Sequence, residues 1–277
     1  MAIKGLDGVA LITGAASGIG RETAYSFAEA GASAIVFADI NKDGAQEAVE
    51  HSKKFAANPN YRAIAVEVDV ADPASVQAMV DATVKEFGQI DYNVNSAGLG
   101  VQSIQPITDT PVDEFDKLAS VNVKGIFLCI QAVTKQMIKQ EPRTIEGRKG
   151  PRNIGRGSII NIGSANSYCP VPGMVQYTSS KHAVMGITKT AALENGAHGI
   201  RVNGVCPSWV DTPMMDLSFE KMPQLKDFIK GVVPLGRIAQ PEEVGDVIAF
   251  LCSPSASYLN GLGVLVDGGV TLTVHLG

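Results

Sequence analysis

The chain has 277 residues, of which 45% are hydrophobic and 18% are charged. This composition excludes an intrinsically disordered chain and is typical of a protein with a large buried core. The 23 Lys and Arg residues against 28 Asp and Glu residues give a net charge of −5. The chain therefore lacks the positive field that nucleic-acid phosphates require, and nucleic acid is not an expected partner.

Cysteine and histidine spacing excludes two further classes. The four cysteines contain no Cys-x-x-Cys pair and the four histidines show no ligand spacing, so neither a zinc site nor a disulfide framework is predicted. The first residues contain no apolar run suited to a signal peptide. No stretch approaches the roughly 18 apolar residues of a membrane-spanning helix. These features predict a cytoplasmic protein with reduced thiols, no bound metal and no membrane contact.

Short apolar runs alternate with longer amphipathic stretches along the whole chain. Apolar segments of strand length, separated by helix-length connections, are typical of a parallel sheet covered by helices, and right-handed crossovers then predict a doubly wound α/β fold. No linker divides the chain, so one domain over residues 1–277 is expected. The predicted strands are 9–13, 34–38, 63–66, 91–95, 158–162, 202–205 and 264–266, and the predicted helices are 18–30, 45–55, 75–87 and 177–197.

A glycine-rich run, Thr-Gly-Ala-Ala-Ser-Gly-Ile-Gly at 13–20, follows the first predicted strand and opens a helix. Glycines in such a turn let the backbone approach a pyrophosphate, which free amides and the helix N-terminus stabilise. The spacing differs from the commoner Gly-x-Gly-x-x-Gly, and a tight turn without a ligand is the alternative, but the position between strand and helix favours a nucleotide. The residues expected at the pyrophosphate are Gly14, Ser17, Gly18, Ile19 and Gly20.

Asp39 ends the second predicted strand, 19 residues after Gly20. A carboxylate at this position can accept hydrogen bonds from both adenosine ribose hydroxyls and would repel a 2′-phosphate. The alternative role is an N-cap for the following helix. No Arg or Lys occupies position 16, 17 or 40, although Lys42 is near. We therefore predict that Asp39 and Ile40 bind NAD(H), with NADP(H) left open by Lys42.

Two more strand ends carry candidate cofactor contacts. Asp69 and Val70 follow the third strand, where a carboxylate can either meet the adenine amino group or cap the next helix. Asn95, Ala97 and Gly98 follow the fourth strand. Small residues there would let the cofactor lie across the strand ends, and a simple tight turn is the alternative.

Four polar residues in the second half of the chain are candidates for catalysis. Tyr177 and Lys181 are one turn apart in a predicted helix, so the ammonium can lie beside the phenol. A phenol has an ordinary pKa of about 10, and a neighbouring positive charge lowers it. Ser164 follows the fifth strand, where it can bond a substrate oxygen or be a plain loop hydroxyl. Asn122 lies in an apolar helical run, where an Asn needs a partner or bends the helix.

The segment 141–157, which lies between Asn122 and Ser164, differs in composition from the rest of the chain. It contains five basic residues, two acids, two prolines and four glycines. A solvated insertion between a helix and the fifth strand is favoured over a basic docking surface.

Taken in order, these motifs resemble those of the short-chain dehydrogenase/reductase family. They are the run at 13–20, Asn95-x-Ala97-Gly98, Asn122, Ser164, Tyr177-x-x-x-Lys181, the segment from Pro207 through Thr212 and the run at 266–269, so the resemblance covers essentially the whole chain. Ser96 and Ser208 depart from it, because the family usually carries Asn and Gly there. The resemblance implies a single-domain Rossmann fold, with a seven-stranded parallel sheet in the order 3-2-1-4-5-6-7 and helices on both faces.

The resemblance also implies a reaction, the transfer of a hydride between nicotinamide and the carbon of a carbonyl or secondary alcohol. Tyr177 would be the general acid or base, and Lys181 would lower its pKa and bind the nicotinamide ribose. Ser164 would orient the substrate oxygen, and Asn122 would hold a water in a proton relay. Further cofactor contacts are expected from Tyr177, Lys181, Pro207, Val210 and Thr212.

By the same resemblance, a cofactor half spans about 1–157, a catalytic and substrate half about 158–277, and a substrate loop about 208–237. The large apolar side chains of this loop are Trp209, Met214, Met215, Leu217, Phe219 and Met222. They indicate a bulky apolar ketone or alcohol, and packing on the core or on another subunit explains them equally well.

The expected partners are a small-molecule substrate and further copies of the chain. The resemblance implies a homotetramer or homodimer, and the apolar tail at 270–274 suits burial at such an interface. Two other functions stay open, a cofactor-binding protein with a non-redox role and a polyol or sugar dehydrogenase. An epimerase or dehydratase of nucleotide sugars shares the Tyr–Lys pair but usually has a longer C-terminal substrate domain.

Overall fold

The computed structural model describes residues 5–273, and one parallel sheet of seven strands organises them. The strand order is β3-β2-β1-β4-β7-β8-β9, with every neighbouring pair parallel. This confirms the predicted order, because β5 and β6 form a separate ribbon. The strands of the sheet are β1 (Val9–Thr13), β2 (Ala34–Asp39), β3 (Arg62–Glu67), β4 (Tyr92–Asn95), β7 (Gly157–Ile162), β8 (Ile200–Pro207) and β9 (Gly263–Val266).

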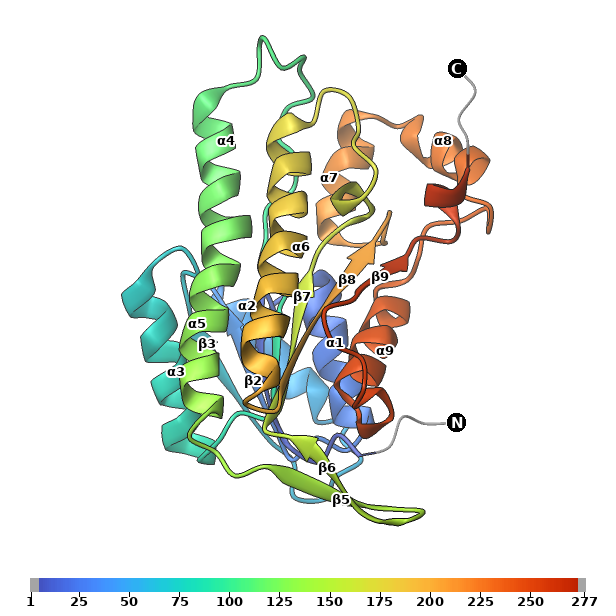
Figure 1. Cartoon of the computed structure of the whole chain (residues 1–277). Helices are drawn as coiled ribbons and strands as arrows, with labels where there is room; N and C mark the ends of the chain where they lie inside the picture. Colours follow the sequence, from blue (N-terminus) through green and yellow to red (C-terminus); the bar gives the residue numbers. More distant parts are fainter. Residues whose placement is uncertain (1–4, 274–277) are drawn as a thin grey trace.

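Helices cover both faces of the sheet, as predicted (Figure 1). On one face pack α1 (Gly18–Glu29), α2 (Lys42–Ser52) and α9 (Pro241–Cys252), whose buried side chains share one hydrophobic cluster with Ile12, Ile35 and Phe37. On the other face pack α3 (Pro73–Phe87), α5 (Ile126–Met137) and α6 (Val175–Gly196), in a second cluster with Leu11 and Ile159. All five residues of β1 are buried, as expected for a central strand covered on both faces.

Capping residues determine where two helices begin, and both begin earlier than predicted. The side chain of Asp72 accepts hydrogen bonds from the backbone N–H groups of Ala74 and Ser75, so α3 begins at Pro73. Asn41 caps α2 by accepting a hydrogen bond from the Gly44 N–H, so α2 begins at Lys42. Asp39 is therefore not the cap of this helix.

A π-helical segment interrupts the long helix on the second face. The segment η1 (Ala119–Gly125) continues α4 (Val112–Leu118) into α5 without a break in direction (Figure 1). Such segments occur frequently at functional sites, and this one contains Asn122.

The basic segment forms a β-hairpin inserted between α5 and β7. Its strands, β5 (Arg143–Gly147) and β6 (Gly150–Gly155), pair antiparallel below the amino ends of the sheet strands (Figure 1). The tip is exposed at Arg148 and Lys149, whereas Arg143 and Arg156 at the base are partly buried.

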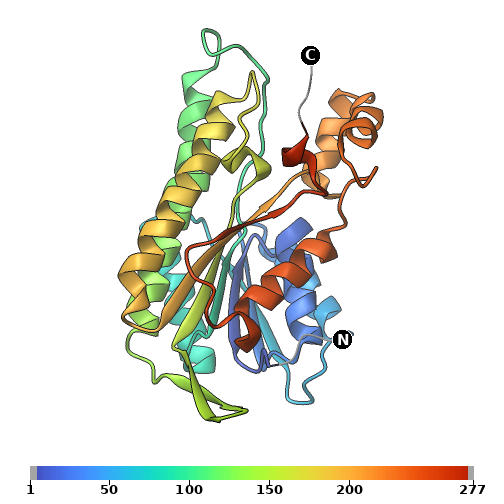
Figure 2. The same cartoon turned by 45° about the vertical axis from the view of Figure 1, so that its right-hand side comes forward.

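Two helices, α7 (Pro213–Lys221) and α8 (Leu225–Val232), extend beyond the carboxyl ends of the strands (Figure 2). They have a small hydrophobic cluster of their own around Phe219, Ile229 and Val233. Three short 3-10 segments complete the fold: η2 (Ala165–Ser167), η3 (Pro254–Ala256) and η4 (Val270–Leu272).

The predicted apolar tail at 270–274 extends past the described residues at position 274. Within it, Leu272 is 85% exposed. Across residues 5–273, no helix combines the length and the apolar character that crossing a bilayer demands.

Candidate active site

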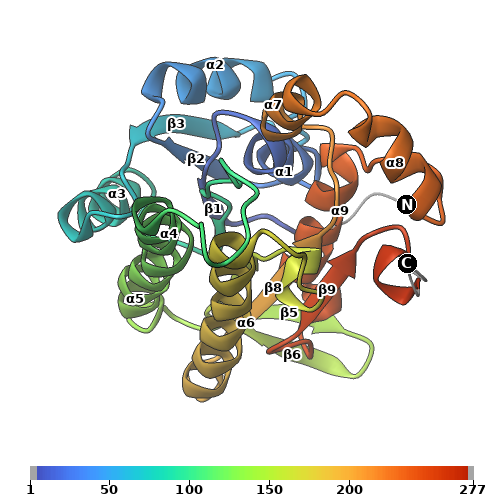
Figure 3. The same ribbon diagram turned by 90° about the horizontal axis from the view of Figure 1, so that it is seen from above.

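The candidate residues gather at the carboxyl ends of the sheet strands. The loops after β1, β2, β4, β7 and β8 all open at this edge, because parallel strands end on the same side (Figure 3). The loops after β1 and β4 lie in direct contact at this edge. Thr13 Oγ1 accepts a hydrogen bond from the Ala97 N–H at 3.2 Å.

The glycine-rich loop after β1 is packed too tightly for side chains. A Cβ on Gly14 would lie 2.7 Å from the Ala97 nitrogen, and one on Gly20 would lie 2.2 Å from the Gly14 carbonyl oxygen. Gly14 and Gly18 also have φ values of +68° and +54°, in the left-handed region that favours glycine. Ser17 occupies the N-cap position of α1 without a side-chain cap, so the first amides of this helix keep their capacity to bind an anion. The loop therefore fits a pyrophosphate.

Asp39 lies against this loop. One carboxylate oxygen accepts a hydrogen bond from the Ala16 N–H at 2.9 Å, and the other accepts one from the Asn41 N–H at 2.9 Å. Each oxygen keeps a lone pair for a further donor. The neighbouring Ile40 is 70% exposed. The carboxylate is thus held against the glycine-rich loop with acceptor capacity left for a hydroxyl group.

At the end of β3, the structure contradicts the capping role considered for Asp69. This carboxylate accepts a hydrogen bond from the Ala71 N–H at 2.9 Å and does not cap α3, whose cap is Asp72. Val70 is buried and packs against Gly125, where a Cβ would lie 2.8 Å from a Val70 methyl group.

The Asn95 side chain points into the sheet and not toward the open edge. It donates to Asn161 Oδ1 at 2.8 Å, and Asn161 donates to Thr188 Oγ1 at 2.9 Å. All three side chains are buried, so this chain of bonds ties β4 to β7 and α6 beneath the site. A cofactor contact at the end of β4 therefore falls to the backbone and to Ala97 and Gly98.

Asn122 clamps the loop that follows β4. Its Oδ1 accepts a hydrogen bond from the Leu99 N–H at 2.8 Å, and its Nδ2 donates to the Leu99 carbonyl at 3.0 Å and to Ser180 Oγ at 3.3 Å. The polar atoms of this side chain are thus engaged by the protein. The role that follows from these contacts is to position the loop over the strand ends.

Ser164, Tyr177 and Lys181 come together although 17 residues separate the first from the last. The Ser164 hydroxyl lies close enough to the Tyr177 phenol to lower its pKa. Lys181 Nζ lies 5.6 Å from the centre of the Tyr177 ring and donates to the Ile162 carbonyl at 3.0 Å. Ser167, which sequence analysis missed, links the two parts. Its hydroxyl accepts from the Ser164 N–H at 3.2 Å and donates to the Lys181 carbonyl at 2.7 Å.

Burial has the largest effect on the pKa values of Tyr177 and Lys181. Burial raises the pKa of Tyr177, and the nearby Ser164 hydroxyl lowers it by a smaller amount. The net direction is upward, opposite to the lowering expected from a neighbouring ammonium. Burial also lowers the pKa of Lys181 to about 8. At neutral pH the phenol is therefore protonated and the amine is mostly charged.

A second buried network, around Glu114, holds the loop at 99–105 against α6. The carboxylate accepts from the N–H groups of Gln102 and Ser103 at 2.8 and 3.1 Å, from the Ser103 hydroxyl, and from Gln176 Nε2 at 3.2 Å. Gln176 immediately precedes Tyr177. Burial raises the pKa of Glu114, but these hydrogen bonds outweigh it and lower the pKa to about 2. The spacing of residues in the sequence gave no signal for Glu114 or Gln176, because their hydrogen-bond partners lie in other segments of the chain.

We expect Glu114→Gln to lower stability at neutral pH by roughly 1.5–3 kcal/mol, the range for hydrogen bonds to a charged group. The folded-state pKa of about 2 lies below the ordinary value of 4.5, so this stability is fully present above pH 4.5 and is lost as pH falls toward 2. The difference in melting temperature between wild type and variant should shrink over that window. An exposed matched change, Glu47→Gln, should show neither effect, and a constant difference at all pH values would contradict the assignment.

An apolar groove of about 340 Å³ lies at the start of α6, and its lining includes none of Ser164, Tyr177 and Lys181. Its walls come from the loops at 105–107 and 170–173, which are joined by a hydrogen bond from the Gln105 N–H to the Gly173 carbonyl at 3.0 Å. Val175 and Thr178, on either side of Tyr177 in the chain, complete it.

Some large apolar side chains of the segment 208–237 are packed in the fold, and others are exposed. Phe219 is buried in the small cluster of α7 and α8, with Trp209 and Met215 packed against it. Met214 and Leu217 are 46% and 61% exposed. Met214 also covers Gly100, where a Cβ would lie 2.9 Å from its sulfur, so α7 reaches the loop after β4.

The segment after β8 begins at Pro207 and approaches the glycine loop. Val210 is buried and accepts a hydrogen bond from the Thr212 hydroxyl at 3.2 Å, and the Thr212 side chain lies 3.4 Å from where a Gly18 Cβ would be. Ser208, one of the two departures from the family pattern, donates its N–H to the Val266 carbonyl at 3.1 Å. A glycine would make the same backbone bond. Nothing in the structure explains Ser96.

Comparisons show that this chain is similar to known proteins over nearly its whole length. The family model described as enoyl-(acyl carrier protein) reductase matches residues 14–271. The short-chain dehydrogenase anuF of Penicillium roqueforti is 47% identical over 270 residues, which cover 98% of each chain. The D-threitol dehydrogenase of Mycolicibacterium smegmatis is 37% identical over 269 residues, covering 96% of this chain and 94% of the other. The crystal structure of levodione reductase matches with a TM-score of 0.85 at 33% identity, covering 97% of this chain and 99% of that one.

Proposed function

Since this chain belongs to the short-chain dehydrogenase/reductase family and is an NAD(P)-dependent oxidoreductase acting on small molecules, we propose that it interconverts a ketone and a secondary alcohol on a bulky, mostly apolar substrate, with NAD(H) as cofactor. The observation that carries this proposal is the meeting of Ser164, Tyr177 and Lys181, with Lys181 Nζ 5.6 Å from the centre of the Tyr177 ring. This group lies at the sheet edge that also carries the pyrophosphate loop.

The nicotinamide, when bound, supplies or accepts the hydride. Tyr177 gives a proton to the carbonyl oxygen in the reductive direction and takes one back in oxidation. Ser164 orients the same oxygen by hydrogen bonding. Lys181 holds a positive charge beside the phenol, which favours the phenolate that remains after donation. A phenol whose pKa is raised by burial is protonated at neutral pH and is ready to donate.

A screen of ketones with NADH and of secondary alcohols with NAD tests the reaction class. We expect turnover with at least one bulky apolar ketone. Binding of NADH without turnover on any member of a broad panel would favour the non-redox alternative. The four candidate catalytic residues, Asn122, Ser164, Tyr177 and Lys181, are all present, which argues against that alternative.

The preference for NAD(H) rests on Asp39 and gives a direct prediction. Asp39→Asn keeps an acceptor for the Ala16 N–H but removes the charge that repels a 2′-phosphate. We expect the kcat/KM ratio of NADH over NADPH to fall by roughly 10–100-fold, the equivalent of a charged hydrogen bond worth about 1.5–3 kcal/mol. The exposed neighbour Asp43→Asn is the control and should leave the ratio unchanged. A wild-type enzyme that prefers NADPH would refute the role of Asp39.

The apolar character of the substrate is supported by the exposed Met214 and Leu217 on α7 and by the apolar groove at the start of α6. We infer that the loop of about 208–237 closes over the substrate, between a cofactor half of about 1–157 and a catalytic half of about 158–277. A polyol is the second candidate, because D-threitol dehydrogenase is among the relatives. Comparing kcat/KM for cyclic ketones and for small polyols separates the two, and activity confined to polyols would exclude the apolar substrate.

Exposed apolar side chains on α5, α6 and near β9 support a homo-oligomer, either a tetramer or a dimer. Phe127 is 48% exposed, Leu193 is 85% exposed and Tyr258 is 99% exposed. Burial of such groups between copies is favourable. We expect light scattering to give the mass of a dimer or tetramer and Leu193→Glu to reduce it. A monomer at micromolar concentration would refute this assembly.

A further inference from the structure

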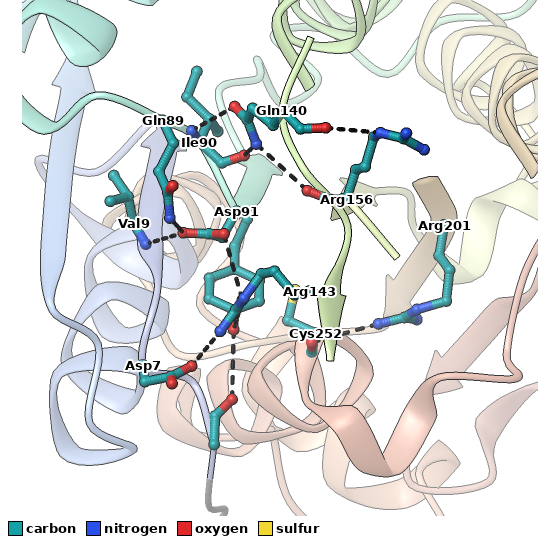
Figure 4. A network of polar contacts seen from close by, with 12 residues as sticks. Asp7, Val9, Gln89, Ile90, Asp91, Gln140, Arg143, Arg156, Arg201 and Cys252 are labelled. Atoms are coloured by element: carbon teal, nitrogen blue, oxygen red, sulfur yellow. Dashed lines mark hydrogen bonds and ion pairs between the residues drawn. The ribbon is translucent and has the colours of Figure 1, made fainter. Parts of the chain in front are cut away.

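The two edges of the sheet are fastened to their neighbouring segments in different ways. At the amino ends, charged groups hold the hairpin, because the Arg143 guanidinium pairs with Asp7 and lies 3.5 Å from the buried carboxylate of Asp91 (Figure 4). At the carboxyl ends, α7 and α8 have no such fastening. Within residues 5–273, no ion pair involves either helix. Since these helices also have a hydrophobic cluster of their own, they are attached to the sheet less strongly than the hairpin is.

Helix α7 contacts the loop after β4 at both of its ends. At its start, Met214 lies over Gly100, where a Cβ would be 2.9 Å from the Met214 sulfur and 3.0 Å from its Cγ. At its end, Lys221 Nζ donates to the Gln102 carbonyl at 3.3 Å. Met214 is 46% exposed and Lys221 is exposed, so both contacts can open without uncovering a buried core. Gln102 is also held from within, since its N–H donates to the Glu114 carboxylate at 2.8 Å.

The loop after β4 is fixed to the body of the protein near the reaction centre. Asn122 holds Leu99 by two hydrogen bonds, of 2.8 and 3.0 Å. One residue earlier, a Cβ on Gly98 would lie 3.3 Å from Asn122 Oδ1 and 4.0 Å from Lys181 Nζ. The loop therefore runs from beside Lys181 to the Met214 contact, and α7 is the partner that is able to move.

The start of α7 bridges two loops that the cofactor is expected to touch. A methyl group of Thr212 lies 3.4 Å from the position of a Gly18 Cβ, so one end of the segment 212–214 meets the glycine-rich loop. Met214, at the other end, lies over Gly100 of the loop after β4. A dinucleotide bound from the glycine-rich loop to Lys181 would contact both loops. The segment 212–214 thus spans the same two elements as the cofactor.

We propose that the segment 212–214 is a gate for the dinucleotide, and that Met214 keeps this gate closed by lying over Gly100. The proposal rests on the binding of the cofactor at the glycine-rich loop and does not depend on the substrate. Gly100 does not have a positive φ, so an alanine fits its backbone and is opposed only by the Met214 side chain. Exchange of the cofactor then requires Met214 to leave Gly100 as α7 lifts.

The rate of cofactor release tests the gate without any substrate. A complex of the protein with NADH is mixed with an excess of NAD, and the loss of NADH fluorescence gives the dissociation rate constant; NADPH and NADP replace them if the wild type binds these more tightly. We expect Met214→Ala to raise this rate constant by roughly tenfold, because the contact that holds the gate closed is lost. Gly100→Ala displaces the same side chain and should raise it as well. Met214→Leu, of similar volume, should keep the wild-type rate.

A double variant separates the gate from two independent effects. Gly100→Ala combined with Met214→Ala should release NADH no faster than Met214→Ala alone, since the side chain that an added Cβ displaces is already gone. Gly186→Ala, at an exposed position of α6 where an added Cβ meets open space, is the matched control and should leave the rate unchanged. A wild-type rate in Met214→Ala, or additive effects in the double variant, would overturn the gate.

Limited proteolysis of the free protein gives a second measurement. Lys221, Lys226 and Lys230 are exposed on α7 and α8, and trypsin should cut there several-fold faster in Met214→Ala than in the wild type. Equal cleavage rates in the two proteins would contradict a gate that Met214 holds closed. Faster NADH release in Met214→Ala without turnover of any ketone would refute the proposed reaction and support the gate, whereas turnover with an unaltered release rate would refute the gate alone.

Discussion

Replacing Tyr177 by Phe is expected to lower kcat by at least about a hundredfold, the lower end of the contribution of general acid catalysis. The phenol lies beside Ser164 and Lys181, so removing its hydroxyl deletes the proposed proton donor and keeps the aromatic ring. The KM for the cofactor should change little, since the aromatic ring stays. Steady-state kinetics with the best ketone of the screen measures this directly.

The control for this prediction is Tyr168→Phe. The Tyr168 hydroxyl lies on the same loop region but donates to the Gly263 carbonyl at 3.2 Å, away from Ser164. This variant should keep most of the activity. Near-normal turnover in Tyr177→Phe, with an unchanged circular dichroism spectrum, would refute the assignment of the proton donor.

Replacing Lys181 by Met is expected to lower the activity and to raise the stability of the protein at pH 7. Activity should fall by about a hundredfold or more, because the phenolate loses the charge that favours it. Stability at pH 7 should rise, because Lys181 is buried and burial lowers its pKa from 10.5 to about 8. That shift corresponds to about 3 kcal/mol of unfavourable interaction, offset in part by the lost hydrogen bond to the Ile162 carbonyl.

The pH dependence of folding stability distinguishes the removal of a buried charge from a change in packing. The folded-state pKa lies below the unfolded one, so the unfolded chain binds more protons between about pH 8 and 10.5, and wild-type stability rises with pH there. The advantage of Lys181→Met should therefore be full below pH 8 and disappear toward pH 10.5. Lys189→Met, at an exposed position of the same helix, should show no such trend. A destabilised Lys181→Met variant at pH 7 would contradict the buried-charge argument.

The reaction centre is held in position by hydrogen bonds between side chains and backbone groups of different elements. Ser167 joins the Ser164 backbone to α6, Asn122 clamps Leu99, and Glu114 holds the loop at 99–105. Each uses charge-assisted or buried hydrogen bonds, which are stronger and more directional than surface contacts. These bonds tie the site to β4 and α6, whereas Met214 and Leu217 on α7 are exposed.

The seven strands, the glycine loop and the Tyr177–Lys181 pair were predictable from sequence, because each depends on local periodicity or on spacing within one element. The strand order was expected only from the family resemblance. Apolar runs buried on both faces need parallel neighbours, and a helix brings residues four apart onto one face whatever its surroundings.

Only the tertiary structure decided the rest, because it depends on contacts between distant segments. Asn41 and not Asp39 caps α2, so the Asp39 carboxylate is directed to the glycine loop. Asn95 turns inward because Asn161 on the neighbouring strand accepts its hydrogen bond. The direction of the Tyr177 pKa follows from burial by surrounding elements, which no spacing in the chain encodes.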